Sequence, residues 1–401
     1  MIPREFVLEQ LCYRDTFPVP FHLDFEGDVA ERLDTYYGGI GWRERLTPYL
    51  RIIEGIDTIQ EKPLSETHTR DVFGGIWRQD RRPSHLEEPA LKSPTFDGYD
   101  FPSFEVFWNE KKKESIQQEL ENHPESFRIV IIPWGLFEQS WRIRGFENAL
   151  MDTITQPDFY QELLNKLTEL YLKFVNVCVG LNCDAIMFGD DWGDQRGVIL
   201  GPHRWREFLK PCWAKIYEAV HNQRKFAITH CCGSVADIMP DIIEIGLDVL
   251  ESVQPEAAGM NPYQLKRKWG DKIVLWGCLG SQGTIPFGTP REIKNEVQKL
   301  CKEMGKNGGS FLVRQKRFSQ RRRQRMQWLL WRHLRGRDKK SHGAERIAQQ
   351  AANSKFQITN RKSLAKKTKI GNPPFSSGLI PNGAKPQPNF IFTQSRKARK
   401  V

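Results

Sequence analysis

The sequence predicts an α/β protein built on a (β/α)₈ TIM barrel, and three observations support this prediction. Short apolar runs alternate with amphipathic helical stretches from about residue 128 to residue 313. The apolar runs are continuous, which is typical of parallel strands that are buried on both faces. There are also enough of them to favour a closed barrel over an open sheet. The seven candidate strands are 18–25, 128–135, 183–190, 226–232, 247–253, 272–278 and 309–313.

The segments between the candidate strands have the spacing of helices that cover a sheet. Residues 159–178 place four large apolar side chains on one stripe at helical spacing. These four are Leu163, Leu167, Leu170 and Phe174. The segments 204–221 and 234–244 show a similar pattern.

The helix before the last candidate strand has the clearest boundaries. Thr289 is a natural N-cap, Pro290 fits the first turn, and Glu292 lies three residues after the cap, as in a capping box. Gly305 is placed to end this helix. A further strand is therefore expected from about residue 309.

Charge divides the chain into two regions at residue 313. Residues 314–401 contain 24 Lys and Arg but only two acidic residues, whereas the whole chain has 60 Lys and Arg and 49 acidic residues. Residues 1–313 therefore carry about −11, and the tail about +22. We expect 1–313 to form the barrel, with a loop-rich insertion at about 60–127, and 314–401 to be a separate, disordered basic tail.

Several classes of protein are not favoured by the sequence. The N-terminus lacks an apolar signal-peptide region, and no apolar run approaches the roughly 18–20 residues of a membrane span. The eight cysteines are scattered, and several lie in apolar segments. This pattern indicates reduced thiols in a cytoplasmic protein rather than a disulfide framework.

Polar residues at the predicted strand ends are the candidates for chemistry, because a barrel places its active site there. Each also has a structural interpretation, such as an Asp that caps the following loop or a Cys that packs in the core. The catalytic candidates are Asp190, Asp191 and Glu251. The candidates for cofactor contacts are His22, Asp24, Gln254 and Gln282. The candidates for metal binding are His230, Cys232 and Cys278.

The motif "THCCGS" (229–234) is the strongest local signal. His230 and Cys232 are two residues apart, so on a strand their side chains face the same side. Imidazole and thiolate together suit zinc. Cys231 would point the other way and pack as a small apolar residue. A zinc site needs a third protein ligand, and the spacing leaves Cys278, Asp191 and Glu251 as alternatives.

Three stretches of the sequence resemble the uroporphyrinogen decarboxylase (URO-D) superfamily. They are "RDVFGGIW" (70–77), "CDAIMFGDDWGDQRGVILGPHRWREFLKPCWAKIY" (183–217) and "THCCGSVADIMPDIIEIGLDVLESVQPEAAGMNPYQLKRKWGDKIVLWGCLGSQGTIPFGTPREI" (229–293). The resemblance covers roughly residues 1–313. It implies a (β/α)₈ barrel with a cleft at the carboxyl ends of the strands.

The superfamily includes decarboxylases, which bind uroporphyrinogen through basic residues and need no metal or cofactor. Their first strand has the form M-R-Q-A-G-R, whereas this chain has "PVPFHLDFEG" (18–27). Neither Arg is present, and His22, Asp24 and Glu26 occupy that neighbourhood. A site for a polyanionic tetrapyrrole should be basic, so the resemblance gives less support to decarboxylation in porphyrin biosynthesis.

The superfamily also includes methyltransferases that move a methyl group between a corrinoid and a thiol. They carry H-x-C and a later Cys, and these residues bind zinc. His230 and Cys232 match H-x-C, but no Cys lies near 309–316, where the later one is expected. The resemblance favours zinc-assisted methyl transfer, with a small molecule or a corrinoid protein as the substrate and no nucleic-acid partner. A third alternative is an inactive barrel that binds a corrinoid or a tetrapyrrole.

The resemblance ends at Val313, where the family continues with a Gly/Pro loop, a segment like I-Q-P-x-T-P-x-E-N and a final helix. One choice of synonymous codons for residues 312–337, read two nucleotides out of frame, gives G-P-A-K-A-I-Q-P-E-T-P-T-E-N-A-V-A-I-V-E-A-F-T-G-A. We therefore expect a frameshift near codon 312. Interleaved Trp and Arg in 314–337 would also suit a nucleic-acid arm, but this alternative explains only the charge. If the chain is made as written, we expect it to lose its last strand–helix unit and with it activity.

Overall fold

The computed structural model describes residues 1–23, 27–45, 49–54, 61–80 and 84–312. All of them lie in the first of two compact units, Met1–Arg337, into which the chain divides. The described residues form an α/β, TIM-barrel-like fold, as predicted. The predicted tail, the candidate Asp24 and the expected continuation after residue 313 lie outside the described residues.

A parallel sheet forms the centre of the fold. Its order is β1-β6-β7-β8-β9-β10-β11, so each strand pairs with the next one along the chain. The strands are β1 (Leu50–Glu54), β6 (Phe127–Ile132), β7 (Ala185–Gly189), β8 (Phe226–His230), β9 (Val249–Val253), β10 (Val274–Gly277) and β11 (Ser310–Leu312). All five residues of β7 are buried, as expected for a strand covered on both faces.

The predicted strand at 18–25 contributes the neighbour of β11. Phe21 forms an isolated parallel bridge with Leu312. The amide of Leu312 donates to the carbonyl of Pro20 over 2.9 Å, and the amide of His22 donates to the carbonyl of Leu312 over 3.2 Å. The Phe21 ring also packs against Tyr49, 5.3 Å between centroids, directly before β1. The segment around Phe21 therefore approaches both edges of the sheet, as a barrel requires.

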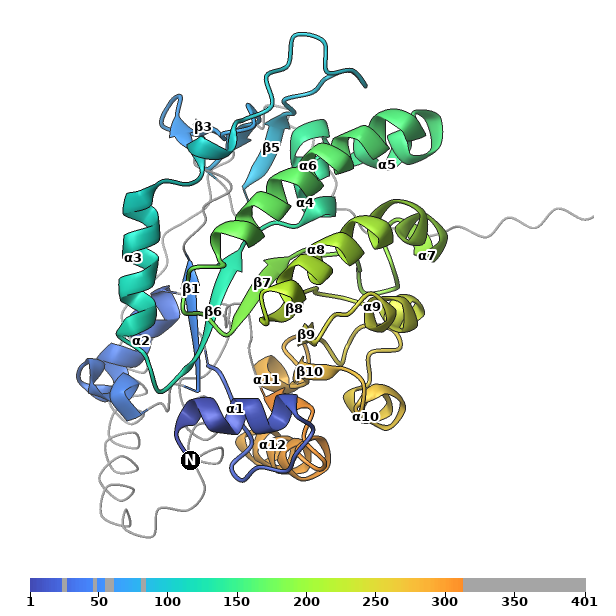
Figure 1. Cartoon of the computed structure of the whole chain (residues 1–401). Helices are drawn as coiled ribbons and strands as arrows, with labels where there is room; N and C mark the ends of the chain where they lie inside the picture. Colours follow the sequence, from blue (N-terminus) through green and yellow to red (C-terminus); the bar gives the residue numbers. More distant parts are fainter. Residues whose placement is uncertain (24–26, 46–48, 55–60, 81–83, 313–401) are drawn as a thin grey trace, which may run out of the picture. The chain divides into compact units, whose positions relative to one another are not determined.

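Helices cover the outer side of the sheet, and Figure 1 shows α3, α4, α6 and α8 around the strands β1, β6, β7 and β8. The α-helices are α1 (Pro3–Leu11), α2 (Gly27–Tyr37), α3 (Glu110–Glu121), α4 (Leu136–Arg144), α5 (Phe146–Thr155), α6 (Pro157–Val177), α7 (Gly201–Arg204), α8 (Lys210–Asn222), α9 (Met239–Glu244), α10 (Pro262–Trp269), α11 (Thr284–Phe287) and α12 (Pro290–Met304). Short 3₁₀ turns occupy Ile40–Arg45, Phe104–Val106 and Ala236–Ile238, and a π-helical turn occupies Trp205–Leu209.

Two of the predicted helices are confirmed in detail. The four apolar residues predicted on one stripe of α6 are all buried. In α12 the Thr289 hydroxyl accepts a hydrogen bond from the amide of Glu292. The Glu292 carboxylate in turn accepts from the amide of Thr289, so both halves of the predicted capping box are present. Gly305 is the C-cap, as predicted.

The sequence-based prediction missed β1. Its five residues, "LRIIE", show no regular pattern of burial, and Arg51 and Glu54 are exposed. Arg51 forms an ion pair with Glu119 of α3. Strands with charged residues facing a covering helix lack the continuous apolar run from which the other strands were predicted.

The segment 60–127 is more ordered than the predicted loop-rich insertion. It contains α3 and an antiparallel sheet in the order β2-β3-β4-β5. These strands are β2 (Lys62–Pro63), β3 (His68–Arg70), β4 (Ile76–Arg78) and β5 (His85–Glu88). Strands of two to four residues, mostly polar, are too short to show the alternating pattern from which they could be predicted.

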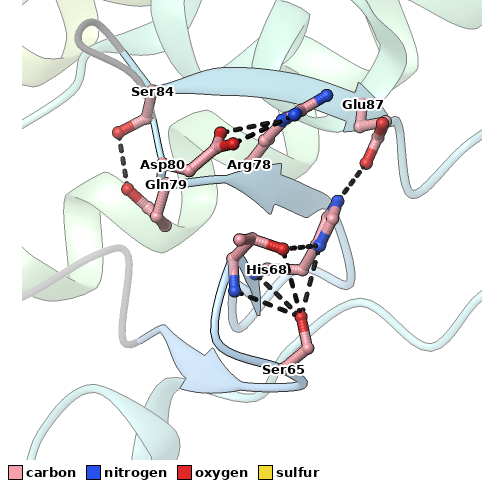
Figure 2. Close-up of polar contacts among 8 residues, drawn as sticks. Ser65, His68, Arg78, Gln79, Asp80, Ser84 and Glu87 are labelled. Carbon is pink, nitrogen blue, oxygen red and sulfur yellow. Dashed lines mark hydrogen bonds and ion pairs between the residues drawn. The ribbon is translucent and has the colours of Figure 1, made fainter.

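Polar side chains connect the strands of this small sheet (Figure 2). The His68 Nε2 atom is 2.5 Å from the Glu87 carboxylate, which accepts its hydrogen bond, and the Nδ1 atom is 2.8 Å from the Thr67 hydroxyl. The Ser65 hydroxyl oxygen accepts from the amides of Thr67 and His68. The Ser65 hydroxyl, the His68 imidazole and the Glu87 carboxylate thus follow one another in the order of a hydrolase triad. The Ser65 oxygen, however, is used to cap its own turn. The network therefore stabilises the sheet.

Among the described residues, no helix combines the length and the apolar character that crossing a membrane requires. All eight cysteines lie in this part of the chain, and none forms a disulfide there. The strand β11 reaches Leu312, so the strand half of the last barrel unit is present up to that residue.

Candidate functional site: a histidine–cysteine–aspartate cluster

The candidate site lies where three neighbouring strands end. The strand β8 ends at His230, which pairs with Gly189, the last residue of β7. On its other side His230 pairs with Glu251 of β9. Because the strands are parallel, their carboxyl ends bring Asp191, His230 and Glu251 to the same edge of the sheet.

Asp191, His230 and Cys232 form a cluster with the geometry of a metal site. One ligand atom of each lies within 4.8 Å of the others. The His230 Nε2 atom is 3.2 Å from the Cys232 sulfur and 3.5 Å from Asp191 Oδ1. Tetrahedral zinc with bonds of about 2.0–2.3 Å separates its ligand atoms by roughly 3.3–3.8 Å. The three residues therefore fit zinc without large movement.

Glu251 contacts the ring nitrogen of His230 that is opposite the one near Cys232. Its carboxylate oxygen Oε2 pairs with Nδ1 of His230, and the Glu251 side chain is fully buried. A neutral His230 that donates from Nδ1 to Glu251 keeps its Nε2 lone pair directed at Cys232 and Asp191. A carboxylate behind a ligating His is a common feature of zinc sites.

Electrostatics at His230 favour its protonated form when no metal is bound. Burial alone would lower the pKa of this imidazole, but Glu251 and Cys232 outweigh burial and raise the pKa to about 10. A metal cation would have to displace this proton, since a ligating imidazole is neutral at the bound nitrogen.

We expect the Glu251–His230 pair to make the metal-free protein less stable at high pH. The folded-state pKa of His230 lies above its ordinary value, so the stabilisation is complete below about pH 6.5 and is lost as the pH rises through about 10. Urea midpoints in the presence of EDTA, measured for the wild type and Glu251→Gln, test this. The difference in urea midpoint between the two proteins should shrink from pH 6 to pH 10. A difference that does not depend on pH would refute the stabilising role of the Glu251–His230 pair.

The other cysteines of the motif and of β10 do not join the cluster. Cys231 is buried and its sulfur accepts a hydrogen bond from the amide of Trp192, as expected for a side chain on the other face of the strand. Cys278 is also buried, and burial raises the pKa of its thiol to about 12. Its backbone has a φ of +71°. Within the described part of the chain, the metal-ligand cluster contains Asp191 instead of Cys278.

The adjacent carboxylates Asp190 and Asp191 have different environments. Asp191 is partly exposed and faces the cluster. Asp190 is fully buried, and burial together with Glu138 raises its pKa to about 8. All its side-chain hydrogen bonds are accepted from N–H groups of Phe137, Glu138, Trp192 and Trp213. The structure thus places Asp190 in the interior and outside the cluster of Asp191, His230 and Cys232.

The structure describes three of the four residues predicted to contact a cofactor, and each has different partners. The His22 ring packs edge-on against Trp276, 6.1 Å between centroids. Gln254 accepts from Gln195 over 2.8 Å and donates to Ser281 over 3.4 Å, so it links the loops after β7 and β10. Gln282 has an exposed side chain, and its amide donates to Glu256. Asp24 lies outside the described residues.

The sequence-based prediction missed Glu138, which is 7% exposed in the first turn of α4. It lies beside Asp190, whose pKa it helps to raise. Its signal was available, since "PWGLFEQ" (133–139) directly follows the predicted strand at 128–135. A buried Glu that follows the carboxyl end of a barrel strand is as good a candidate for the site as Asp190, Asp191 and Glu251.

Comparison with known proteins agrees with the family resemblance of the sequence. The family model described as "Uroporphyrinogen decarboxylase (URO-D)" matches residues 117–313. The match ends at the residue where the resemblance in the sequence ends. Residues 117–313 are therefore similar to the uroporphyrinogen decarboxylase family, in agreement with the resemblance seen in the sequence.

The similar proteins are distant. A uroporphyrinogen decarboxylase from Coxiella burnetii is 26% identical over 44% of this chain and 48% of its own length. One from Pseudoalteromonas translucida is 22% identical over 49% of this chain and 54% of its own length. The chain thus spans about half the length of these relatives. A methyltransferase from Methanosarcina mazei shares the fold with a TM-score of 0.61 at 15% identity, over 84% of this chain and 97% of the other.

Proposed function

We propose that this protein is a zinc-dependent methyltransferase that transfers a methyl group from a corrinoid to a thiol. The observation that carries the proposal is the cluster of Asp191, His230 and Cys232, with Glu251 behind His230. Of the three alternatives for a third ligand, the geometry supports Asp191, because Glu251 contacts the opposite ring nitrogen. The fold that the chain shares with the Methanosarcina mazei methyltransferase is consistent with this function.

The charges at the described strand ends also favour methyl transfer over decarboxylation of uroporphyrinogen. The loops after β7 and β9 carry Asp191, Asp194 and Glu256. Arg196, the basic residue in these two loops, is ion-paired with Asp194 over 2.6 Å. A substrate with many carboxylates would be repelled at this edge of the sheet.

The protein's own residues would prepare the acceptor thiol. Bound zinc would supply a Lewis acid that keeps the thiol ionised at neutral pH. Glu251 fixes the orientation of His230, and the amide of Cys232 donates to Asp191 over 2.7 Å, which fixes that carboxylate. The acceptor sulfur then forms a bond to the methyl carbon while the carbon–cobalt bond breaks, and its electron pair stays with cobalt. The thiol proton is released to solvent.

An assay with methylcobalamin and a small thiol such as 2-mercaptoethanol tests the proposal, on the protein in which the alternative reading frame after codon 312 is restored. We expect zinc-dependent loss of methylcobalamin absorbance together with formation of the methyl thioether. Uroporphyrinogen with the same protein is the comparison. Metal-independent release of CO₂ from uroporphyrinogen, without methyl transfer, would overturn the proposal in favour of decarboxylation.

A further inference from the structure

Three consecutive residues after β7 are connected to the three residues at the end of β8. Three hydrogen bonds make this connection, and in each the donor is a backbone amide. The acceptors are a backbone carbonyl, a sulfur and a carboxylate, so the connection does not depend on one flexible side chain. The hydrogen bonds run from the Asp190 amide to the His230 carbonyl (2.9 Å), from the Trp192 amide to the Cys231 sulfur (3.2 Å) and from the Cys232 amide to Asp191 Oδ1 (2.7 Å).

The Asp190 carboxylate anchors the first of these segments in the interior. It accepts hydrogen bonds from four N–H groups that belong to three different parts of the fold, namely the start of α4, the loop after β7 and α8. The donors are the amides of Phe137 (3.2 Å) and Glu138 (2.8 Å) and the indoles of Trp192 (2.6 Å) and Trp213 (3.1 Å). When it is ionised, this carboxylate also interacts favourably with the helix dipole at the N-terminus of α4.

Close packing leaves Asp190 little freedom. A Cβ atom on Gly135 would lie 2.4 Å from the Cβ atom of Asp190, so only glycine allows this approach. The Trp192 and Trp213 rings, whose centroids are 5.9 Å apart, are both almost fully buried. Because Asp190 and Asp191 are consecutive, the direction of the Asp191 side chain depends on where Asp190 is held.

We propose that Asp190 is a positioning residue, whose buried carboxylate holds the loop after β7 so that Asp191 meets His230 and Cys232. The inference rests on the metal centre proposed above and assigns to Asp190 a role through Asp191. Asp190 itself is fully buried, and its carboxylate oxygens accept hydrogen bonds from the four N–H groups described above. The catalytic role predicted for it from sequence is therefore replaced by an indirect one.

A double-mutant cycle in the full-length protein tests the inference. Co²⁺ affinity is measured for the wild type, Asp190→Asn, Asp191→Asn and the double variant. We expect Asp190→Asn to weaken binding by about 10–100-fold, the size typical of groups that orient metal ligands, and Asp191→Asn, which removes a ligand, to weaken it more. The double variant should bind no more weakly than Asp191→Asn, because Asp190 acts only through Asp191.

A second readout works without metal. In EDTA, the rate at which iodoacetamide alkylates Cys232 is followed by peptide mass spectrometry. The amide of Cys232 donates to Asp191, so freeing Asp191 should change this rate. Asp190→Asn and Asp191→Asn should shift the rate in the same direction, and the double variant should match Asp191→Asn.

Asp152→Asn is the matched control, since Asp152 is also a buried carboxylate and pairs with Arg144 over 2.7 Å. It should lower the melting temperature and leave both readouts unchanged. Additive effects of Asp190→Asn and Asp191→Asn, or the same change in Asp152→Asn, would overturn the inference. If the four proteins give the expected affinities but the wild type does not transfer a methyl group, only the proposed function is refuted. If the wild type binds no cobalt, the metal centre is refuted, and the alkylation cycle decides the role of Asp190.

Discussion

Replacing Cys232 with serine is expected to weaken zinc binding by more than about 100-fold, since losing a direct ligand should exceed the 10–100-fold effect of losing an orienting partner. A serine hydroxyl is not ionised at neutral pH, so it cannot replace the thiolate. Methyl transfer from methylcobalamin should fall to background, and His230→Ala should have the same effect. Competition with a chromophoric chelator measures the affinity.

Cys301→Ser provides the control, because Cys301 is partly buried like Cys232 but lies on α12. It should keep the wild-type affinity and rate. If Cys232→Ser retained wild-type zinc affinity, the cluster would not be a metal site. If it lost zinc but kept methyl transfer, the metal would be structural.

Restoring the alternative reading frame from codon 313 is expected to stabilise the protein. The restored segment contains I-Q-P-E-T-P-T-E-N followed by a helix-like stretch with several apolar residues. Burying about two or three leucine-sized side chains contributes on the order of 5 kcal/mol. For a domain of this size that corresponds to an increase in melting temperature of about 10 °C. Soluble yield and thermal melts of the two full-length proteins measure the difference.

DNA sequencing across codon 312 tests the frameshift itself. An unbroken frame, with peptides from 340–400 detected in the cell, would exclude a sequencing error and show that the basic tail is made. A 401-residue protein that melts cooperatively at the same temperature as the restored one would show that the barrel does not need the family's last helix.

The central strands could be predicted because burial on both faces leaves continuous apolar runs in the sequence. The runs at 183–190 and 226–232 correspond to β7 and β8, in which almost every residue is buried. This signal is absent where one face of a strand meets charged or polar groups. The strand β1 was overlooked for this reason, and the strands of 62–88 are in addition too short to show a pattern.

In the site, the strand period placed His230 and Cys232 on the same side, and the structure confirms that their side chains meet. The sequence could not decide which of Asp190 and Asp191 faces them, because that depends on the N–H donors that α4 and α8 bring to Asp190. It could not place Cys278 either. The left-handed backbone at this residue ends the alternation from which its direction would be inferred.

X-ray absorption at the zinc edge of the metal-loaded, full-length protein tests the central claim most directly. The account predicts one sulfur at about 2.3 Å, from Cys232, and nitrogen or oxygen neighbours at about 2.0–2.2 Å, from His230, Asp191 and a water or acceptor. Asp191→Asn should lose one light-atom neighbour and keep the sulfur. Two sulfur neighbours, which would bring Cys278 into the site, or no sulfur at all would contradict it.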